Sequence, residues 1–137
     1  MTIKSRGAKE VRKRIEKIGK QSDISGRAGV WAGALIVEGE AKRRVPVEHG
    51  FLRASGATTI TSGESAKKFT VRVGFSTKYA AFVHENLEAK WKGRPRKSGK
   101  GVYWGPAGEP RYLYNAVVAK LAEYKATVAA YMRRAVK

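Results

Sequence analysis

The chain has 137 residues, no cysteine and a formal net charge of +18, from 29 Lys and Arg against 11 Asp and Glu. The length fits a single domain over residues 1–137, because domains typically have about 100–150 residues, and the lack of cysteine excludes disulfides, thiolate metal sites and a cysteine nucleophile. Small domains usually carry a net charge of magnitude about 2–8, so this surplus predicts an acidic counterpart: nucleic acid, an anionic membrane or a protein neighbour.

The first predicted element is a basic amphipathic helix over residues 4–20, within a basic N-terminal arm that covers residues 1–22. Its apolar residues recur at spacings of three and four and form one narrow stripe, while Lys and Arg fill most other positions. The stripe consists of Ala8, Val11, Ile15 and Ile18. Two interpretations remain open: a helix that faces DNA or a membrane, and a solvated helix with a thin core contact.

A break is predicted over residues 20–25, which Gly19 and Gly26 bracket. A second helix is predicted over residues 26–44. Pro46 ends this helix, because proline disfavours helical geometry in the residue before it. This helix has two apolar faces, which implies one contact inside the chain and another with a neighbouring molecule. Oligomer contacts are therefore predicted on this helix at Trp31, Leu35 and Val37.

A turn at residues 49–50 is predicted to lead into a hairpin, with strands over residues 57–60 and 68–75. Apolar residues alternate through the second strand with a period of two. Residues 62–65 supply the polar and glycine side chains typical of a hairpin turn. A short helix is predicted after the hairpin, over residues 79–88.

Residues 88–104 form a basic loop, in which glycine, proline and serine disfavour regular structure before a short returning strand at residues 102–105. Its cations are Lys90, Lys92, Arg94, Arg96, Lys97 and Lys100. Its aromatic residues, also predicted as oligomer contacts, are Trp91, Tyr103 and Trp104. The cations either face DNA, with the aromatics stacking on bases, or meet an acidic protein partner, with the aromatics as anchors in a subunit contact.

Pro110 is predicted to open the last helix, where its missing N–H costs nothing, and an apolar stripe continues to about residue 134. The order of elements predicts an α+β fold. In this fold a small antiparallel sheet is packed by a long N-terminal helix and a long C-terminal helix, and the basic loop is an extension.

The sequence contains no constellation that points to catalysis. His84 and Glu85 are the tempting pair, but adjacent residues point in different directions on a helix or strand, so a metal ion would need ligands from elsewhere. Gly-rich phosphate loops and nucleophile elbows are absent. We therefore expect no catalytic residue, no metal site and no cofactor, and a structural role for this pair.

Three segments carry a recognisable pattern in order. Val45–Ser55 reads P-V-E-H-G-F-L-R-A-S after its first residue, Val73–Asn86 contains V-G-F-S-T-K-Y-A-A-F-V-H-E, and Pro110–Ala116 reads P-R-Y-L-Y-N-A. Together they resemble the phage tail-component family, the neck and tail-completion proteins of long-tailed phages. The chain departs from the family pattern at His49, where threonine is commoner, and in the strongly cationic loop.

The matching residues are predicted to form a structural clasp that aims the basic loop at a neighbour. Gly50 takes a turn conformation that a side chain would strain, and Arg53 binds a carboxylate, with Glu48 or Glu85 as candidates. The remaining members of the clasp are Tyr79, His84 and Glu85.

The resemblance implies a non-enzymatic virion protein of a tailed bacteriophage, located at the neck or tail junction and assembled in the host cytoplasm. The expected role is a homo-oligomeric, ring-forming neck, connector or tail-completion subunit around the DNA channel. Its partners would be portal or adaptor proteins, tail proteins and, through non-specific contact, packaged DNA. A tail terminator or minor capsid protein is an alternative, and a non-specific DNA-binding module is an alternative from another class. No apolar run reaches the roughly 18 residues that span a bilayer, so no membrane partner is expected.

Overall fold

The structure is a computed structural model that describes residues 2–47, 49–61, 68–88, 92–105 and 107–136, with side chains from residue 7 onward. Its elements, in chain order, are α1 (Thr2–Arg44), α2 (Phe51–Ala54), β1 (Gly56–Ile60), β2 (Val71–Phe75), α3 (Ala80–Glu85) and α4 (Tyr112–Val136). Two long helices and a small antiparallel sheet confirm the predicted α+β class. The turn predicted at residues 62–65 lies outside the described residues.

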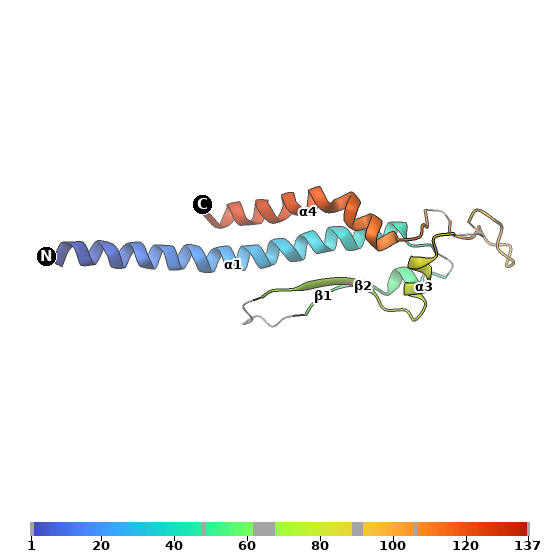
Figure 1. The fold of residues 1–137 in the computed structure, drawn as a ribbon, viewed down its shortest axis with the longest axis horizontal. Coiled ribbons are helices and arrows are strands. Elements are labelled where there is room, and N and C mark those ends of the chain that lie inside the picture. The colour runs from blue at the N-terminus through green and yellow to red at the C-terminus, as the bar shows by residue number, and fades with distance from the viewer. Residues whose placement is uncertain (1, 48, 62–67, 89–91, 106, 137) are drawn as a thin grey trace.

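The long helix α1 is the spine of the molecule, with α4 along one side and the hairpin along the other (Figure 1). It is continuous over its 43 residues, so the predicted break at residues 20–25 is wrong. Each glycine inside a helix costs about 1 kcal/mol relative to alanine, but this does not end a helix that packing supports. The described side chains of residues 7–21 are all exposed, and this part of α1 extends beyond the end of α4 (Figure 1). The arm therefore makes no core contact of its own.

Glycines let α4 approach α1 closely, and we call Gly26, Gly29 and Gly33 the glycine seam. A Cβ atom added at Gly26 would lie 3.1 Å from the sulfur of Met132, and one at Gly29 would lie 3.0 Å from Cβ of Tyr131. At Gly33 an added Cβ would overlap the ring of Tyr124. Later glycines of α1 contact earlier residues of α4, so the two helices pack antiparallel. Gly19 and Gly26 were interpreted from the sequence as the limits of a helix break. In the structure, Gly26 instead belongs to the surface of α1 on which α4 packs.

The core consists of two small clusters at the end of α1 that is remote from the arm. One contains Val45, Leu52, Ala80 and Tyr112, and the other contains Val37, Ala41 and Ala116. The partly buried side chains of Phe75 and Leu113 pack against both clusters and join them. The sheet, both long helices and the two short helices therefore meet in one place.

The hairpin pairs Gly56 with Phe75 and Ile60 with Val71, in antiparallel register. The first strand agrees with the prediction, whereas β2 begins at Val71 rather than at residue 68. Polar contacts tie the hairpin to the spine: Thr58 Oγ1 donates to a carboxylate oxygen of Glu38 at 2.6 Å, and Lys42 Nζ donates to the other oxygen at 2.5 Å. Partial burial raises the pKa of Glu38, but these two bonds outweigh it and hold the pKa below its ordinary value.

Three further features differ from the sequence-based expectation: α2 was not predicted, α3 covers Ala80–Glu85 rather than residues 79–88, and the last helix begins later. The single-turn helix α2 follows Gly50, which takes the left-handed φ of 82° in which glycine is favoured. The last helix begins at Tyr112 rather than at Pro110. Arg111, with a φ of 53°, turns the chain just before α4, and its N–H donates to the carbonyl of His84 at 2.7 Å. This bond ends the loop and fixes the start of the helix.

The glycine seam predicts opposite effects for the same substitution at two positions of α1. Gly33→Ala forces a methyl group into the ring of Tyr124 and should destabilise the protein by about 1–3 kcal/mol, as overpacking does. An alanine at Gly39, where an added Cβ meets nothing within 4 Å, should instead stabilise the helix by up to about 1 kcal/mol. Urea unfolding followed by circular dichroism measures both, and an equal gain in the two variants would contradict the close packing of α4 on this seam.

Candidate functional site

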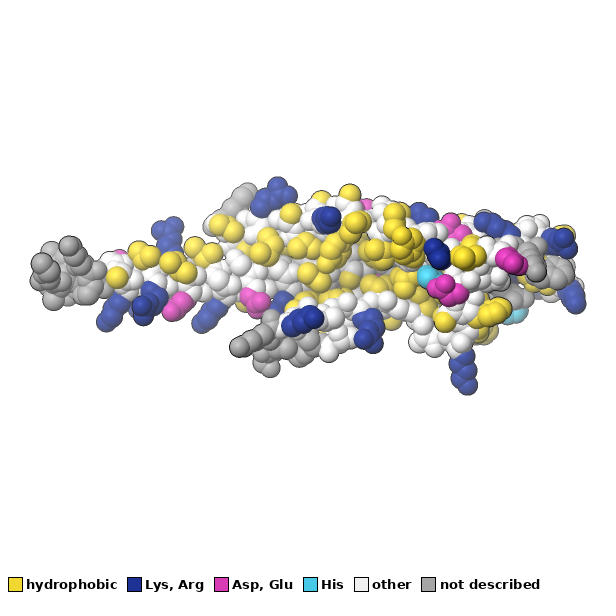
Figure 2. Space-filling view, in the orientation of Figure 1, with side chains coloured by type: hydrophobic (Ala, Val, Ile, Leu, Met, Phe, Trp, Pro, Cys, Tyr) yellow, Lys and Arg dark blue, Asp and Glu magenta, His cyan; other side chains and the backbone are white. Residues whose placement is uncertain are grey.

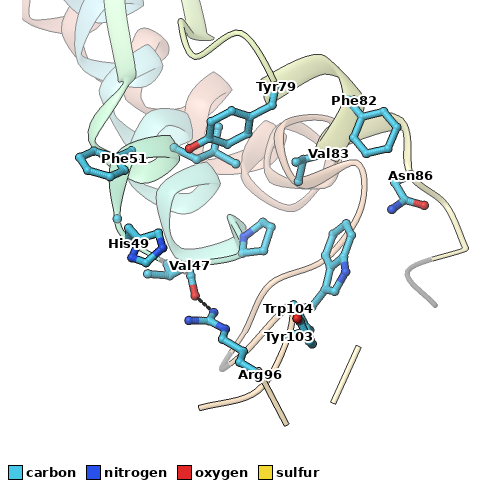
Figure 3. A pocket seen from close by; sticks show the side chains of 13 residues that line it. Val47, His49, Phe51, Tyr79, Phe82, Val83, Asn86, Arg96, Tyr103 and Trp104 are labelled. Atoms are coloured by element: carbon cyan, nitrogen blue, oxygen red, sulfur yellow. Dashed lines mark hydrogen bonds between the residues drawn. The ribbon is translucent and has the colours of Figure 1, made fainter. Parts of the chain in front are cut away.

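A pocket of about 290 Å³ opens at the end of the molecule opposite the N-terminal arm. Three stretches of chain supply its walls: residues 46–47 and 49–52, the region of α3 from Tyr79 to Asn86, and the basic loop (Figure 3). The loop contributes Arg96, Tyr103 and Trp104. We call this cavity the aromatic pocket, since its lining also includes Phe51, Tyr79 and Phe82.

The basic loop has a defined fold within the described residues 92–105. Pro95 and Val102 form an isolated antiparallel bridge, and Tyr103 N–H donates to the carbonyl of Arg94 at 2.9 Å. The guanidinium of Arg96 donates to the carbonyl of Val47 and so ties the loop back to the segment after α1 (Figure 3). The loop was expected to lack regular structure up to residue 101. It instead forms a tight hairpin, because backbone hydrogen bonds and glycines with positive φ allow the chain to reverse.

The loop aromatics turn toward the pocket. Tyr103 and Trp104 are half-buried and line it (Figure 3). Trp104 has a φ of 61°, a left-handed conformation that costs about 1–2 kcal/mol for a residue with a side chain. Such strain persists only where the surrounding structure fixes it. The backbone at Trp104 is thus fixed by its surroundings where the residue lines the pocket.

The predicted cations of the loop occupy its outside. The described Lys92, Arg94, Lys97 and Lys100 are exposed, and Arg96 is partly buried against the chain. Lys90 and Trp91, predicted as a cationic contact and an oligomer contact, lie outside the described residues. The arrangement separates the two chemical properties of the loop: the aromatics face the pocket and the lysines face solvent.

The predicted clasp centres on His84. Its Nδ1 lies 2.8 Å from a carboxylate oxygen of Glu85, and its Nε2 accepts a hydrogen bond from the N–H of Tyr114 at 3.5 Å. These two contacts together place the proton of a neutral ring on Nδ1. Since the carbonyl of His84 also accepts the N–H of Arg111, His84 links α3 to the start of α4.

The other clasp candidates are distributed differently. Tyr79 and Gly50 line the aromatic pocket. Arg53 is exposed, and of its two expected partners Glu85 is paired with His84. The other expected partner, Glu48, lies outside the described residues. The described residues build the link between α3 and α4 on His84, and the pairing of Arg53 with a carboxylate stays a prediction.

Sequence reasoning missed Tyr112, which is 1% exposed and lies at the centre of this region. Its hydroxyl donates to the carbonyl of Ala80 at 3.0 Å, and its ring meets those of Phe75 and His84 edge-on, with centroids 5.1 Å apart in both pairs. Burial raises the pKa of Tyr112 to about 12. A signal was present, because Tyr112 and Tyr114 both follow Pro110, but their spacing alone does not tell which ring faces inward.

An ionic junction joins the end of α1 to the approach of α4. Arg44 donates to Glu40 at 2.8 Å and to Glu109 at 2.8 Å, and Asn115 Nδ2 donates to Glu109 at 3.2 Å. The hydrogen bond from Arg44 holds the pKa of Glu109 below its ordinary value, and the bonds to Glu109 and Glu40 raise the pKa of Arg44. The junction fixes both ends of the segment that carries the loop.

Among the described residues, no three His, Cys, Asp or Glu side chains gather in a way that would hold a metal ion. No helix in the described ranges combines the length and apolar character needed to cross a bilayer.

The chain matches, over residues 9–85, the model of the HK97-gp10-like family, described as "Bacteriophage HK97-gp10, putative tail-component". The match covers more than half of the sequence, from the arm to the end of α3. The chain belongs to this family. The resemblance to phage tail components is thereby confirmed, and the protein is a structural tail component of a bacteriophage virion. No curated protein and no solved structure matches the chain.

Membership of the family places the tail component among virion proteins and points to a structural rather than an enzymatic role. The matched range contains Val45–Ser55 and almost all of Val73–Asn86. Pro110–Ala116 lies beyond it. The structure nevertheless connects all three segments, because Tyr112 packs against Leu52, Ala80 and their neighbours.

The helical residues predicted as oligomer contacts do not share one environment in the tail component. Leu35 is 45% exposed and Trp31 is half-buried, so the chain itself leaves part of both side chains uncovered. Val37 is buried in the cluster with Ala41 and Ala116. The chain's own α4 covers that face of α1, so a neighbouring subunit cannot reach Val37 in this conformation.

The link through His84 predicts a measurable loss of stability on its removal. His84→Ala should lower the free energy of unfolding by about 1–2 kcal/mol, because it removes an acceptor for Tyr114 and the edge-on contact with Tyr112. Glu85→Ala is the control, since it removes only the exposed carboxylate of the pair. Equal unfolding midpoints in urea for the two variants would rule out His84 as the link.

Tyr112 predicts an alkaline transition. Its pKa in the folded protein, about 12, lies above the ordinary value of 10.0, so the neutral hydroxyl favours the folded state. This contribution to the free energy of unfolding is complete below pH 10 and is lost as the pH rises toward 12. Tyr112→Phe should cost about 1 kcal/mol at neutral pH through the lost bond to Ala80. Its stability should then fall less steeply than that of the wild type between pH 10 and 12, in urea titrations at fixed pH. Parallel pH profiles would contradict this role.

Proposed function

We propose that this tail component is a ring-forming neck, connector or tail-completion subunit that surrounds the DNA channel at the junction of head and tail. The observation that carries the proposal is the large apolar surface that the elongated subunit leaves uncovered on its two long helices. Figure 2 shows hydrophobic side chains gathered over α1 and α4 on one face of the molecule.

The exposed stripe of α4 is the clearest of these surfaces. Its residues occupy positions i, i+3, i+4 and i+7, so they lie along one side of the helix. They are Tyr114, Val117, Val118 and Leu121. A second stripe on α1 contains Ile24 and Leu35, which are also exposed. Monomeric proteins rarely leave extended apolar patches in water, so both stripes support contact with neighbours.

Two different surfaces support a ring rather than a symmetric dimer. When one patch of a subunit contacts a different patch of the next, the contact is heterologous, and repetition of a closing rotation generates a ring. The stripes of α1 and α4 differ in residues and in position, so each can serve as the partner of the other. The family supports this use, since a tail component functions inside an assembly.

The charge of the chain supports a position next to DNA. A net charge of +18 repels itself in a compact subunit and more strongly in a ring. Phosphates along a central duplex would neutralise cations of the arm and the loop without sequence preference. The same contacts suit a tail terminator or a minor capsid protein, which remain alternative positions in the virion.

A non-specific DNA-binding module is the candidate from another class, and the net charge favours it. The structure gives less support to single-strand binding by the loop, because Tyr103 and Trp104 line the aromatic pocket and do not project as a platform for bases. Measuring the affinity of the isolated protein for duplex DNA at several salt concentrations decides whether its positive charge is sufficient for DNA binding.

Native mass spectrometry of the purified protein, and of particles that contain it, tests the ring. We expect a closed oligomer, and negative-stain images with a central hole wide enough for a duplex. Val118→Asp combined with Leu121→Asp should give a folded monomer, because both side chains are exposed in the subunit. Ile60→Asp, an exposed apolar position on the hairpin, is the matched control and should leave the oligomer intact. A wild-type chain that is monomeric both in solution and in particles would overturn the proposal.

A further inference from the structure

We infer that the aromatic pocket binds an acidic segment of a neighbouring virion protein, which inserts a large apolar side chain between Phe51, Phe82 and Trp104. The inference rests on the proposed function for the class of partner, because it takes that partner from the virion. It goes further by naming the site and the chemistry of the segment that the site accepts.

The shape and lining of the pocket favour an apolar anchor. Phe51 is 68% exposed and Phe82 is 74% exposed, and both belong to the lining (Figure 3). Two large aromatic side chains at one cavity, open to water, are unfavourable in an isolated subunit and favourable in a contact. Pockets that receive a buried aromatic or aliphatic anchor carry most of the affinity in protein interfaces.

The pocket is formed before any partner binds. The bond from Arg96 to the carbonyl of Val47 joins the loop wall to the opposite wall. Gly108 packs so closely against Pro46 that an added Cβ would lie 2.5 Å from the Cα of Pro46. The same added Cβ would lie 2.5 Å from the carbonyl oxygen of Trp104, so Gly108 packs against both walls. A preformed site binds more tightly, because the partner does not have to order the loop.

The charge around the pocket selects an acidic partner. The chain segments that form and adjoin its walls, residues 46–53, 78–88 and 92–104, contain three acidic residues, Glu48, Glu85 and Glu88, and Glu85 is paired with His84. Their cations are Arg53, Lys78, Lys92, Arg94, Arg96, Lys97 and Lys100. A positive surface of this kind attracts an acidic segment and disfavours partners of like charge.

The positive charge of the chain also favours a different protein over a second copy of this chain as the occupant of the pocket. A second copy also carries a charge of +18, and its arm and loop would bring further cations to the pocket. Duplex DNA would satisfy the charge but presents phosphates and sugars at its surface, which do not fill an apolar cavity. An acidic segment with a large apolar side chain satisfies both the cations and the aromatic lining.

Peptide titration of the full-length ¹⁵N-labelled chain tests the inference. The probe is an acetylated, amidated hexapeptide of sequence EELFEE, with KKLFKK and EESSEE as matched peptides that reverse the charge or remove the anchor. EELFEE should shift the indole resonance of Trp104 and bind at least tenfold more tightly than either control. Equal binding of EELFEE and either control peptide would overturn the inference, and so would a thymidine hexanucleotide that competes as strongly as EELFEE.

Variants identify the site. Phe82→Ser should weaken EELFEE binding at least tenfold, whereas Tyr114→Ser, an exposed aromatic position on α4, should leave it unchanged. Lys97→Glu combined with Lys100→Glu should weaken EELFEE and strengthen KKLFKK. Both Phe82 and Tyr114 are exposed, so circular dichroism should show each serine variant folded. Equal affinity for EELFEE in the Phe82→Ser and Tyr114→Ser variants would refute the assignment. The titration reports on the pocket whether or not the chain forms a ring, so its outcome and that of the mass measurement are independent.

Discussion

The close packing of α4 on the glycine seam of α1 is the constraint on which the remaining structure depends. Because Gly26, Gly29 and Gly33 carry no side chains, the backbone of α4 settles against the spine, and the start of α4 is set at the end of α1. That position delivers Tyr112 into the core, where its hydroxyl reaches Ala80 and orients α3. The aromatic pocket is therefore built on a contact that lies far along the helices from it.

The subunit stabilises itself at one place and leaves the rest of its surface for neighbours. Its buried clusters gather where α1 ends and α4 begins, while the arm and the stripe of α4 stay uncovered. For a protein that works alone this would be a liability in water. For a tail component it is consistent with a subunit whose fold is completed by assembly, in which neighbours cover apolar stripes and neutralise the excess of positive charge.

The basic loop shows how one segment can hold two kinds of contact. Its exposed lysines act over long distance and respond to salt, whereas Tyr103 and Trp104 line a cavity whose contacts depend on shape. In the contact that we propose, charge brings an acidic partner to this end of the molecule, and the aromatic lining fixes where it binds. The link between α3 and α4 through His84 holds the pocket in position, since Tyr79 and Phe82 lie on or beside α3.

The sequence by itself determined the α+β class, the first strand, the short helix after the hairpin and the family, because periodicity and local motifs are properties of neighbouring residues. The tertiary structure decided that α1 continues through Gly26, because the missing side chain at this position lets Met132 of α4 pack closely against the helix. It also decided that Val37 faces the chain's own α4, that Tyr112 rather than Tyr114 faces inward, and that the loop aromatics line a pocket. These outcomes depend on which distant side chain occupies the space opposite, and spacing along the chain carries no information about that.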